Sequence, residues 1–134
     1  MKPIVPYLLF NGNCKEAMNF YKDCFGGNLE IFTFADAPDP SACGNAKPDQ
    51  IMHASLTKGD FVLMASDDPM GAPKAGNTIS LSIPVDTIEE TKALFNKLAE
   101  GGNITMPLAE TFWAAQFGML TDKYGFHWML NCDN

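Results

Sequence analysis

Two amphipathic helical patterns, each followed by the same three residues, constrain this chain more than any other feature. The first extends from Cys14 to Phe25 and the second from Ile88 to Glu100. In both, apolar residues recur every three or four positions, the spacing of a helix with one buried face. Gly26-Gly27-Asn28 follows the first pattern and Gly101-Gly102-Asn103 the second, and glycines at such positions end helices. The pattern predicts two similar halves.

Strand patterns fill the rest of each half. Short runs of β-branched, aromatic and aliphatic residues, bounded by Gly, Pro, Asn or Asp, predict eight strands. These are Ile4 to Phe10, Leu29 to Phe34, Gln50 to Leu56, Asp60 to Ser66, Thr78 to Val85, Ile104 to Met106, Trp113 to Thr121 and Phe126 to Asn131. The order β-α-β-β-β therefore occurs twice. We expect one α+β domain over residues 1–134, with module one at about 1–70 and module two at about 76–134.

Several connections have their own signals. Asn13 is the expected N-cap of the first helix, and Asp86 or Thr87 that of the second. The Pro- and Gly-containing stretch from Ala35 to Pro48 predicts a long loop, of the kind that acts as a lid or flap. Asp67 and Asp68 are expected in a solvated turn.

Composition excludes several function classes. The net charge of −7 repels phosphate backbones and anionic headgroups, so nucleic acid and membrane surfaces are not expected partners. No apolar run approaches the roughly 18 residues of a spanning helix, and the N-terminal segment does not resemble a secretory signal, so a cytoplasmic location is expected. The four cysteines lack metal-site spacing, and Cys24 is expected to be a core thiol.

Short motifs in order along the chain resemble one known family. Pro6-Tyr7-Leu8-Leu9-Phe10, Phe20-Tyr21-Lys22 and Phe25-Gly26-Gly27 form the opening of this resemblance. Further motifs continue it in register: Ile51-Met52-His53-Ala54, Leu63-Met64-Ala65-Ser66-Asp67, Met106-Pro107-Leu108, Thr111-Phe112-Trp113, Gly118-Met119 and Asp122-Lys123-Tyr124-Gly125. Together they resemble the PhnB-like proteins of the vicinal-oxygen-chelate superfamily, which includes glyoxalases, dioxygenases and bleomycin-resistance proteins.

This resemblance implies two βαβββ modules whose curved mixed sheets surround a cavity, the glyoxalase/bleomycin-resistance fold. It also implies a homodimer. Most enzymes of the superfamily hold a divalent metal through His, Glu or Gln on the first and last strands of each module. Because the same fold serves many reactions, it leaves the reaction of this chain open.

The resemblance places the metal-ligand positions on residues that make poor ligands. They fall at Pro6, Leu63, Thr78 and Met129. Divalent ions require several nitrogen, oxygen or thiolate donors that converge, and only the Thr78 hydroxyl offers a weak one. We therefore expect no metal and no other cofactor at the usual place.

The alternation of side chains predicts the lining of the implied cavity. If Ile79, Leu81 and Ile83 pack on a helix, the intervening hydroxyl residues face the cavity. The expected ligand-binding residues are Leu8, Phe10, Ser55, Phe61, Leu63, Thr78, Ser80, Ser82, Trp113 and Met129. Mostly apolar walls with a few polar groups are typical of a small-molecule pocket.

Three side chains are candidates for a specific chemical role. His53 and His127 are the only histidines and the candidate catalytic residues, because imidazole can act as acid or base near neutral pH. Each is also a candidate for an ordinary hydrogen-bonded strand residue. Trp113 is suited to stack on a flat ligand, or equally to pack in the core or at a dimer interface.

Three functions remain open on this basis, so catalysis itself stays undecided. The leading hypothesis is a metal-free dimer that binds or sequesters an unknown small molecule. The second is a metal-independent enzyme that uses His53 or His127. The third is a metal-dependent glyoxalase-like lyase or transferase. The sequence does not identify the ligand, nor whether its pocket lies within one chain or across a dimer.

Overall fold

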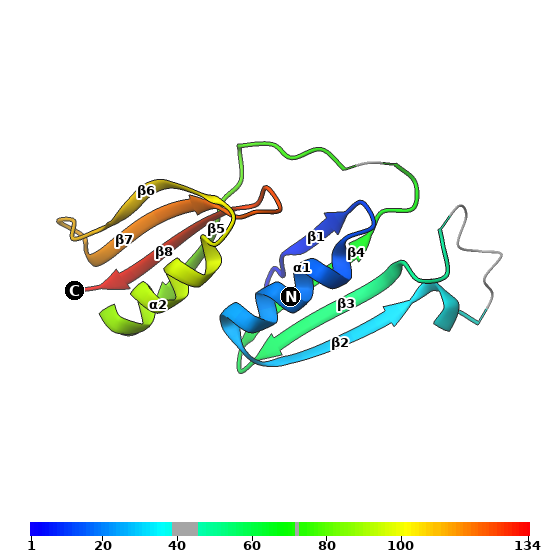
Figure 1. Cartoon of the computed structure of the whole chain (residues 1–134). Helices are drawn as coiled ribbons and strands as arrows, with labels where there is room; N and C mark the ends of the chain where they lie inside the picture. The colour runs from blue at the N-terminus through cyan, green and yellow to red at the C-terminus, as the bar shows by residue number, and fades with distance from the viewer. Residues whose placement is uncertain (39–45, 72) are drawn as a thin grey trace. The chain divides into compact units, whose positions relative to one another are not determined.

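The computed structural model describes residues 1–38, 46–71 and 73–134 (Figure 1). These residues form two compact units, unit 1 from Met1 to Lys74 and unit 2 from Ala75 to Asn134. Half of the predicted loop from Ala35 to Pro48, residues 39–45, lies outside the described residues, and a short 3-10 helix, η1 (Phe34–Asp36), lies at its start.

Among its described residues, unit 1 contains one α-helix, one short 3-10 helix and one four-stranded sheet. Its elements are β1 (Tyr7–Phe10), α1 (Cys14–Phe25), β2 (Asn28–Thr33), η1, β3 (Ile51–Lys58) and β4 (Phe61–Asp67). The strand order is β1-β4-β3-β2. β1 pairs with β4 in parallel, and the other two pairings are antiparallel. The Gly59-Asp60 turn between β3 and β4 gives a tight hairpin in which Lys58 pairs with Phe61.

Unit 2 repeats this arrangement. Its elements are β5 (Leu81–Val85), α2 (Ile88–Leu98), β6 (Asn103–Ala109), β7 (Ala114–Thr121) and β8 (His127–Asp133). The order β5-β8-β7-β6, with β5 parallel to β8, corresponds strand by strand to unit 1. The predicted α+β fold with two βαβββ modules is confirmed. The strand predicted from Thr78 begins only at Leu81, so Thr78 and Ser80 lie outside the sheet.

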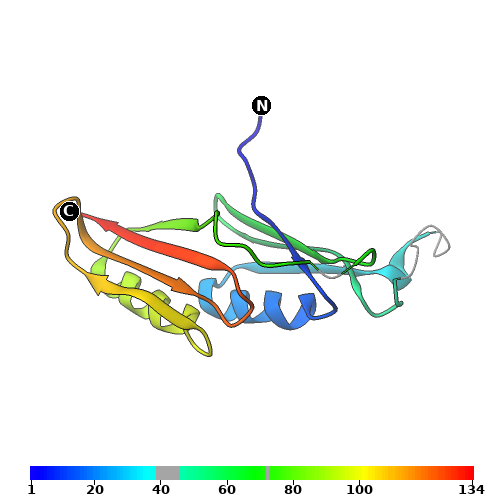
Figure 2. The same ribbon diagram turned by 90° about the horizontal axis from the view of Figure 1, so that it is seen from above.

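One face of each sheet is covered by the helix of its own unit (Figure 2). In unit 1 the strand residues on this face are fully or nearly fully buried: Leu8, Phe10, Ala54, Leu56, Leu63 and Ala65. In unit 2 Trp128, Leu130 and Leu120 are buried in the same way. Within the described residues, no helix of the same unit lies on the opposite face. We call this opposite surface the helix-free face of each unit.

A buried carboxylate closes the start of α1. Asp67, which is only 2% exposed, accepts hydrogen bonds at Oδ1 from the backbone N–H groups of Gly12 and Cys14 (2.9 and 3.0 Å). Its Oδ2 accepts a third bond from the Ile51 N–H (2.8 Å). Asn13 occupies the N-cap position but makes no capping bond with its side chain. The prediction that Asp67 lies in a solvated turn was wrong, because the end of β4 points it into the core.

Unit 2 uses different residues for the equivalent tasks. The Thr87 hydroxyl accepts a hydrogen bond from the Glu90 N–H (3.1 Å), which confirms one of the two predicted caps of α2. Asp122, at the turn before β8, is buried like Asp67. Its carboxylate accepts bonds from the Tyr124 and Phe126 N–H groups and from the Trp128 indole (2.8 Å). This carboxylate therefore orders the turn and fixes the largest side chain in the core.

Cys14 provides a test of the core beneath α1. Burial raises the pKa of its thiol from 9.0 to about 12, and the Asp67 carboxylate adds to the rise. The folded state then holds this proton more tightly than the unfolded state does. We expect the free energy of unfolding to fall as pH rises from about 9.0 toward 12. Denaturant titrations of wild type and Cys14→Ala across this range should show a shallower decline in the variant, and equal declines would contradict the assignment.

The described cysteines form no disulfide with one another. Cys132 is buried, whereas Cys24 is half-buried and so only partly matches the expected core position. Among the described residues, no helix is long and apolar enough to cross a membrane.

Candidate functional site: the helix-free faces of the two sheets

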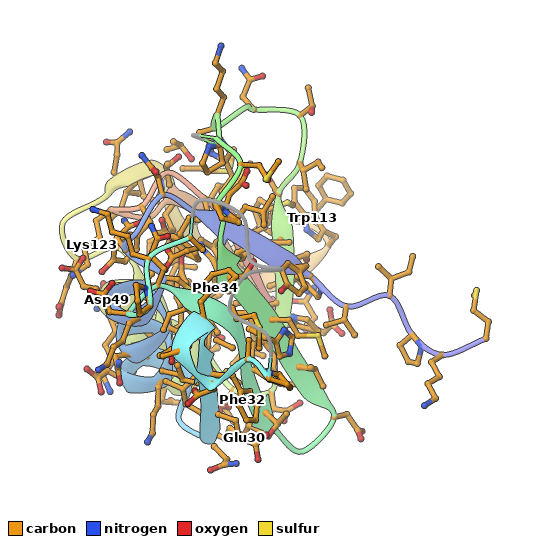
Figure 3. The ribbon with its side chains drawn as sticks, turned by 90° about the vertical axis from the view of Figure 1, so that its right-hand side faces the viewer. Glu30, Phe32, Phe34, Asp49, Trp113 and Lys123 are labelled. Atoms are coloured by element: carbon orange, nitrogen blue, oxygen red, sulfur yellow. The ribbon has the colours of Figure 1, made fainter. Side chains whose placement is uncertain are left out.

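The helix-free face of unit 1 carries a row of side chains that runs across all four strands. The pairing register places Tyr7, Met64, Ser55 and Glu30 side by side, one from each strand. The next row contains Leu9, Ser66, His53 and Phe32. Phe32 and Glu30 project from β2 next to one another (Figure 3). The face thus combines exposed apolar surface with hydroxyl, imidazole and carboxylate groups.

Tyr7 and His53 form the main polar contact on this face. The Tyr7 hydroxyl lies 3.2 Å from His53 Nδ1, and the ring centroids are 5.8 Å apart. Tyr7 is 46% exposed, and His53 is half-buried. β4 lies between their strands, so the tyrosine reaches across it to the imidazole. The contact fixes one ring nitrogen of His53, and the structure shows no hydrogen bond to the other among the described residues.

The helix-free face of unit 2 is richer in methionine. The row equivalent to that of Tyr7 contains Ser82, Met129, Met119 and Met106. Ser82 is exposed, and Met129 and Met119 are half-buried. Methionine side chains adapt to the shape of their contacts, which suits a surface that accepts a ligand. The predicted positions of Ser82 and Met129 on this face match the structure.

His127 lies on the same face of unit 2 but in a different setting. Its Nε2 is 2.8 Å from the Gly76 carbonyl oxygen, and its Nδ1 is 2.9 Å from the Thr121 hydroxyl. Since a carbonyl only accepts, Nε2 must carry a proton and donate it. Both ring nitrogens are then occupied, and the histidine ties the segment before β5 to the β7–β8 hairpin. This arrangement favours a structural role.

Trp113 lies immediately before β7 and is half exposed (Figure 3). Its ring meets Phe117 edge to face at a centroid distance of 5.5 Å, and Phe112 meets it at 4.9 Å. Phe117 belongs to the helix-free face, because it pairs with Asn131 one position beyond the covered Gly118. The indole is therefore available at the margin of that face, which leaves the predicted stacking role open.

Four residues predicted to line the cavity lie elsewhere. Leu8, Phe10 and Leu63 are buried on the covered face of the sheet in unit 1. Phe61 packs against Phe25 of α1, with ring centroids 5.1 Å apart. These four side chains form the core beneath the helix. Thr78 and Ser80 are exposed but precede the sheet, whereas Ser55 does share the helix-free face with His53.

The register also corrects the expected metal-ligand positions. Met129 pairs with Ser82 on β5, and the same position in unit 1 is Met64, which pairs with Tyr7 on β1. Leu63, the predicted counterpart of Met129, points to the opposite face. The resulting set contains a phenol, a hydroxyl and two thioethers, and hard divalent ions bind such groups poorly. No group of three His, Cys, Asp or Glu suited to a metal occurs among the described residues.

Comparison with known proteins gives the family. A family profile described as 3-demethylubiquinone-9 3-methyltransferase matches residues 2–131. The chain belongs to this family. The PhnB-like resemblance is confirmed by a Bacillus cereus structure described as a putative 3-demethylubiquinone-9 3-methyltransferase, PhnB protein. That structure is 32% identical, with a TM-score of 0.78, over 98% of this chain and 99% of the other.

Other known proteins are similar to this chain along nearly their whole length. The crystal structure of PA1353 from Pseudomonas aeruginosa is 49% identical with a TM-score of 0.87, over 99% of this chain and 98% of that one. Protein YjdN of Escherichia coli is 34% identical over 96% of this chain and 94% of its own. A glyoxalase/bleomycin resistance protein/dioxygenase family enzyme from Burkholderia phytofirmans, 15% identical with a TM-score of 0.67, covers 97% of each chain and shares the fold.

Sequence reasoning missed the partners of His53. Tyr7, Met64, Phe32 and Glu30 were not among the predicted site residues, although each lies on the helix-free face. The only available signal was the alternation Tyr7-Leu8-Leu9-Phe10. Because every member of that run is apolar or aromatic, it does not show which alternate set faces the helix.

Proposed function

We propose that this PhnB-like protein binds a small, partly apolar molecule without a metal ion, on the helix-free faces of its sheets. The single observation that carries this proposal is the composition of those faces. Around Tyr7, His53 and Ser55 in unit 1, and around Ser82 and Met129 in unit 2, polar groups are few and set among aromatic and thioether side chains. Such surfaces bind small molecules through apolar contact and use their polar groups for orientation.

The metal-free part of the proposal rests on donor chemistry. At the positions that correspond to the usual ligand positions, unit 1 has Tyr7 and Met64, and unit 2 has Ser82 and Met129. No carboxylate or imidazole occurs in that set. A metal-dependent lyase or transferase mechanism therefore finds little support in this chain's own residues. We also propose that the protein acts as a homodimer, as its family resemblance implies.

One observation favours a second candidate, a metal-independent enzyme. The hydrogen bond between the Tyr7 hydroxyl and His53 Nδ1 holds an imidazole in a defined orientation on a ligand-sized surface. A general acid or base requires such an oriented group within reach of its substrate. His127 lacks this quality, since both of its nitrogens already have partners. Methyl transfer, which the family description names, has no group on these faces that argues for it.

The binding proposal is tested by thermal shift and metal analysis on the purified full chain. We expect no stoichiometric Zn, Ni, Mn or Fe and no rise in melting temperature when these ions are added. We expect a subset of a small-molecule library, rich in aromatic compounds, to raise the melting temperature by mass action. Ser55→Leu and Met129→Glu should weaken those hits, whereas Glu89→Gln, on the exposed start of α2, should not. Bound metal that raises the melting temperature, or a library without hits, would overturn the proposal.

A further inference from the structure

The two histidines differ in whether a ring nitrogen remains available to a ligand. His127 uses Nε2 for the Gly76 carbonyl and Nδ1 for the Thr121 hydroxyl. His53 uses Nδ1 for the Tyr7 hydroxyl at 3.2 Å. No described residue forms a hydrogen bond with His53 Nε2 in the structure. Of the two imidazoles, only that of His53 therefore has a nitrogen ready for a ligand.

Tyr7 is a suitable partner for either protonation state of His53. A phenolic hydroxyl both donates and accepts, so it can donate to a bare Nδ1 or accept from a protonated one. When it accepts, the neutral ring carries its proton on Nδ1 and Nε2 becomes a base. When Nε2 also gains a proton, the Nδ1–H bond to the Tyr7 oxygen is retained. The contact therefore positions the ring without fixing its charge.

The side chains around His53 determine the size and polarity of the ligands that can bind there. Phe32 pairs directly with His53 from β2 and is 48% exposed. Leu9 and Met64 add apolar surface from β1 and β4. These side chains suit the body of a flat or compact apolar molecule. In the adjacent row, Tyr7 provides the polar contact at 3.2 Å, and Ser55 lies two residues along β3.

We propose that His53 accepts a proton at Nε2 from a small, weakly acidic ligand, a phenol or an enol on an apolar body, and retains the resulting oxyanion beside the imidazolium. The O–H bond of the ligand breaks, its electron pair stays on oxygen, and an N–H bond forms at Nε2. Nδ1–H donates to the Tyr7 oxygen throughout. Tyr7 is the positioning residue. This inference rests on the proposed binding function and names the class of ligand.

The charge of the protein agrees with uptake of a neutral acid rather than of a preformed anion. The chain carries a net charge of −7, which repels anions from solution. On the helix-free face of unit 1, the described strands carry two titratable groups besides His53, Tyr7 on β1 and Glu30 on β2. The residues of β4 on this face are Val62, Met64 and Ser66, which do not titrate. A ligand that enters neutral and transfers its proton avoids the long-range repulsion.

The test uses 4-nitrophenol, whose phenolate absorbs visible light, with 4-nitroanisole as its neutral analogue. Full-length protein is titrated against the probe at a pH where free probe is mostly protonated. We expect wild type to raise the phenolate absorbance and to bind 4-nitrophenol more tightly than 4-nitroanisole. His53→Gln should abolish the absorbance change and weaken binding roughly tenfold, because the loss of one hydrogen bond to a charged group lowers affinity by about this factor. Tyr7→Phe should reduce both, and Glu89→Gln, the control on the exposed start of α2, should preserve both.

The outcomes separate this inference from the binding proposal. Circular dichroism confirms that each variant is folded before it is compared. An unchanged absorbance signal in His53→Gln, or its loss in Glu89→Gln, overturns the role of His53. Library ligands that raise the melting temperature equally in wild type and His53→Gln, together with no 4-nitrophenol signal, overturn this inference and leave the binding proposal standing. A protein that binds neither the probe nor any library compound fails both.

Discussion

Replacement of Asp67 by alanine is expected to lower the free energy of unfolding by about 3 kcal/mol or more. Three backbone N–H groups, those of Gly12, Cys14 and Ile51, lose their acceptor. Two of these contacts are buried, so water does not readily replace the carboxylate. Each unsatisfied buried donor costs about 1–3 kcal/mol. Urea unfolding followed by circular dichroism measures the loss.

Asp68 provides the matched control for this prediction. It is the next residue, it has the same side chain, and its Oδ1 accepts one exposed bond from the Met70 N–H (2.9 Å). Asp68→Ala should change the free energy of unfolding by no more than about 1 kcal/mol. The free energy of unfolding of Asp67→Asn should lie between those of the two alanine variants. The amide oxygen of the asparagine can still accept hydrogen bonds, but the NH₂ group that replaces the second carboxylate oxygen cannot accept one. Equal effects of Asp67→Ala and Asp68→Ala would contradict the capping role.

The second large effect is expected at Gly102, where α2 leads into β6. A Cβ at this position would overlap the Thr121 carbonyl oxygen and lie 2.9 Å from the Asp122 carbonyl carbon. These are backbone atoms, so no side-chain rotation relieves the overlap. Gly102→Ala should destabilise the protein by about 2 kcal/mol or more, because the turn that holds Asp122 has to shift. Thermal unfolding and near-ultraviolet circular dichroism, which reports on Trp128, measure the change.

Gly76→Ala serves as the control within the same unit. Nothing lies within 4 Å of a Cβ built at Gly76, and its carbonyl remains available to His127. This variant should unfold close to the wild-type midpoint. An equally stable Gly102→Ala variant would contradict the close approach between Gly102 and the backbone of the β7–β8 turn.

The fold was predictable because its signals are local and occur twice. The helical spacing from Cys14 and from Ile88, the glycine pairs and the Thr87 cap all appear within a few residues of the elements they control. The true cap of α1 was not predictable in this way. Asp67 is 53 residues away from Cys14 along the chain and reaches it only after β4 has paired with β1. Sequence proximity made Asn13 the obvious candidate instead.

The site was less predictable, because it depends on register. Alternating side chains of a strand face opposite sides of the sheet, so an error of one residue reverses every assignment. The match of Leu63 with Met129 was such an error, and the structure places Met64 at the equivalent position. Ser82 pairs with Met129 on the helix-free face, and on β5 the alternation of Ser with Leu or Ile is clear. On β1, where all residues are apolar or aromatic, no such contrast existed.

The pairing of β1 with β4, and of β5 with β8, means that each sheet is completed entirely by strands of its own unit. The described residues of the connection between Asp67 and Leu81 therefore contribute no strand to either ladder. Two copies that exchanged their second units would keep every inter-strand hydrogen bond of the two sheets. Refolding at high protein concentration, where chains meet before each has closed on itself, is the condition under which such domain-swapped dimers should be sought.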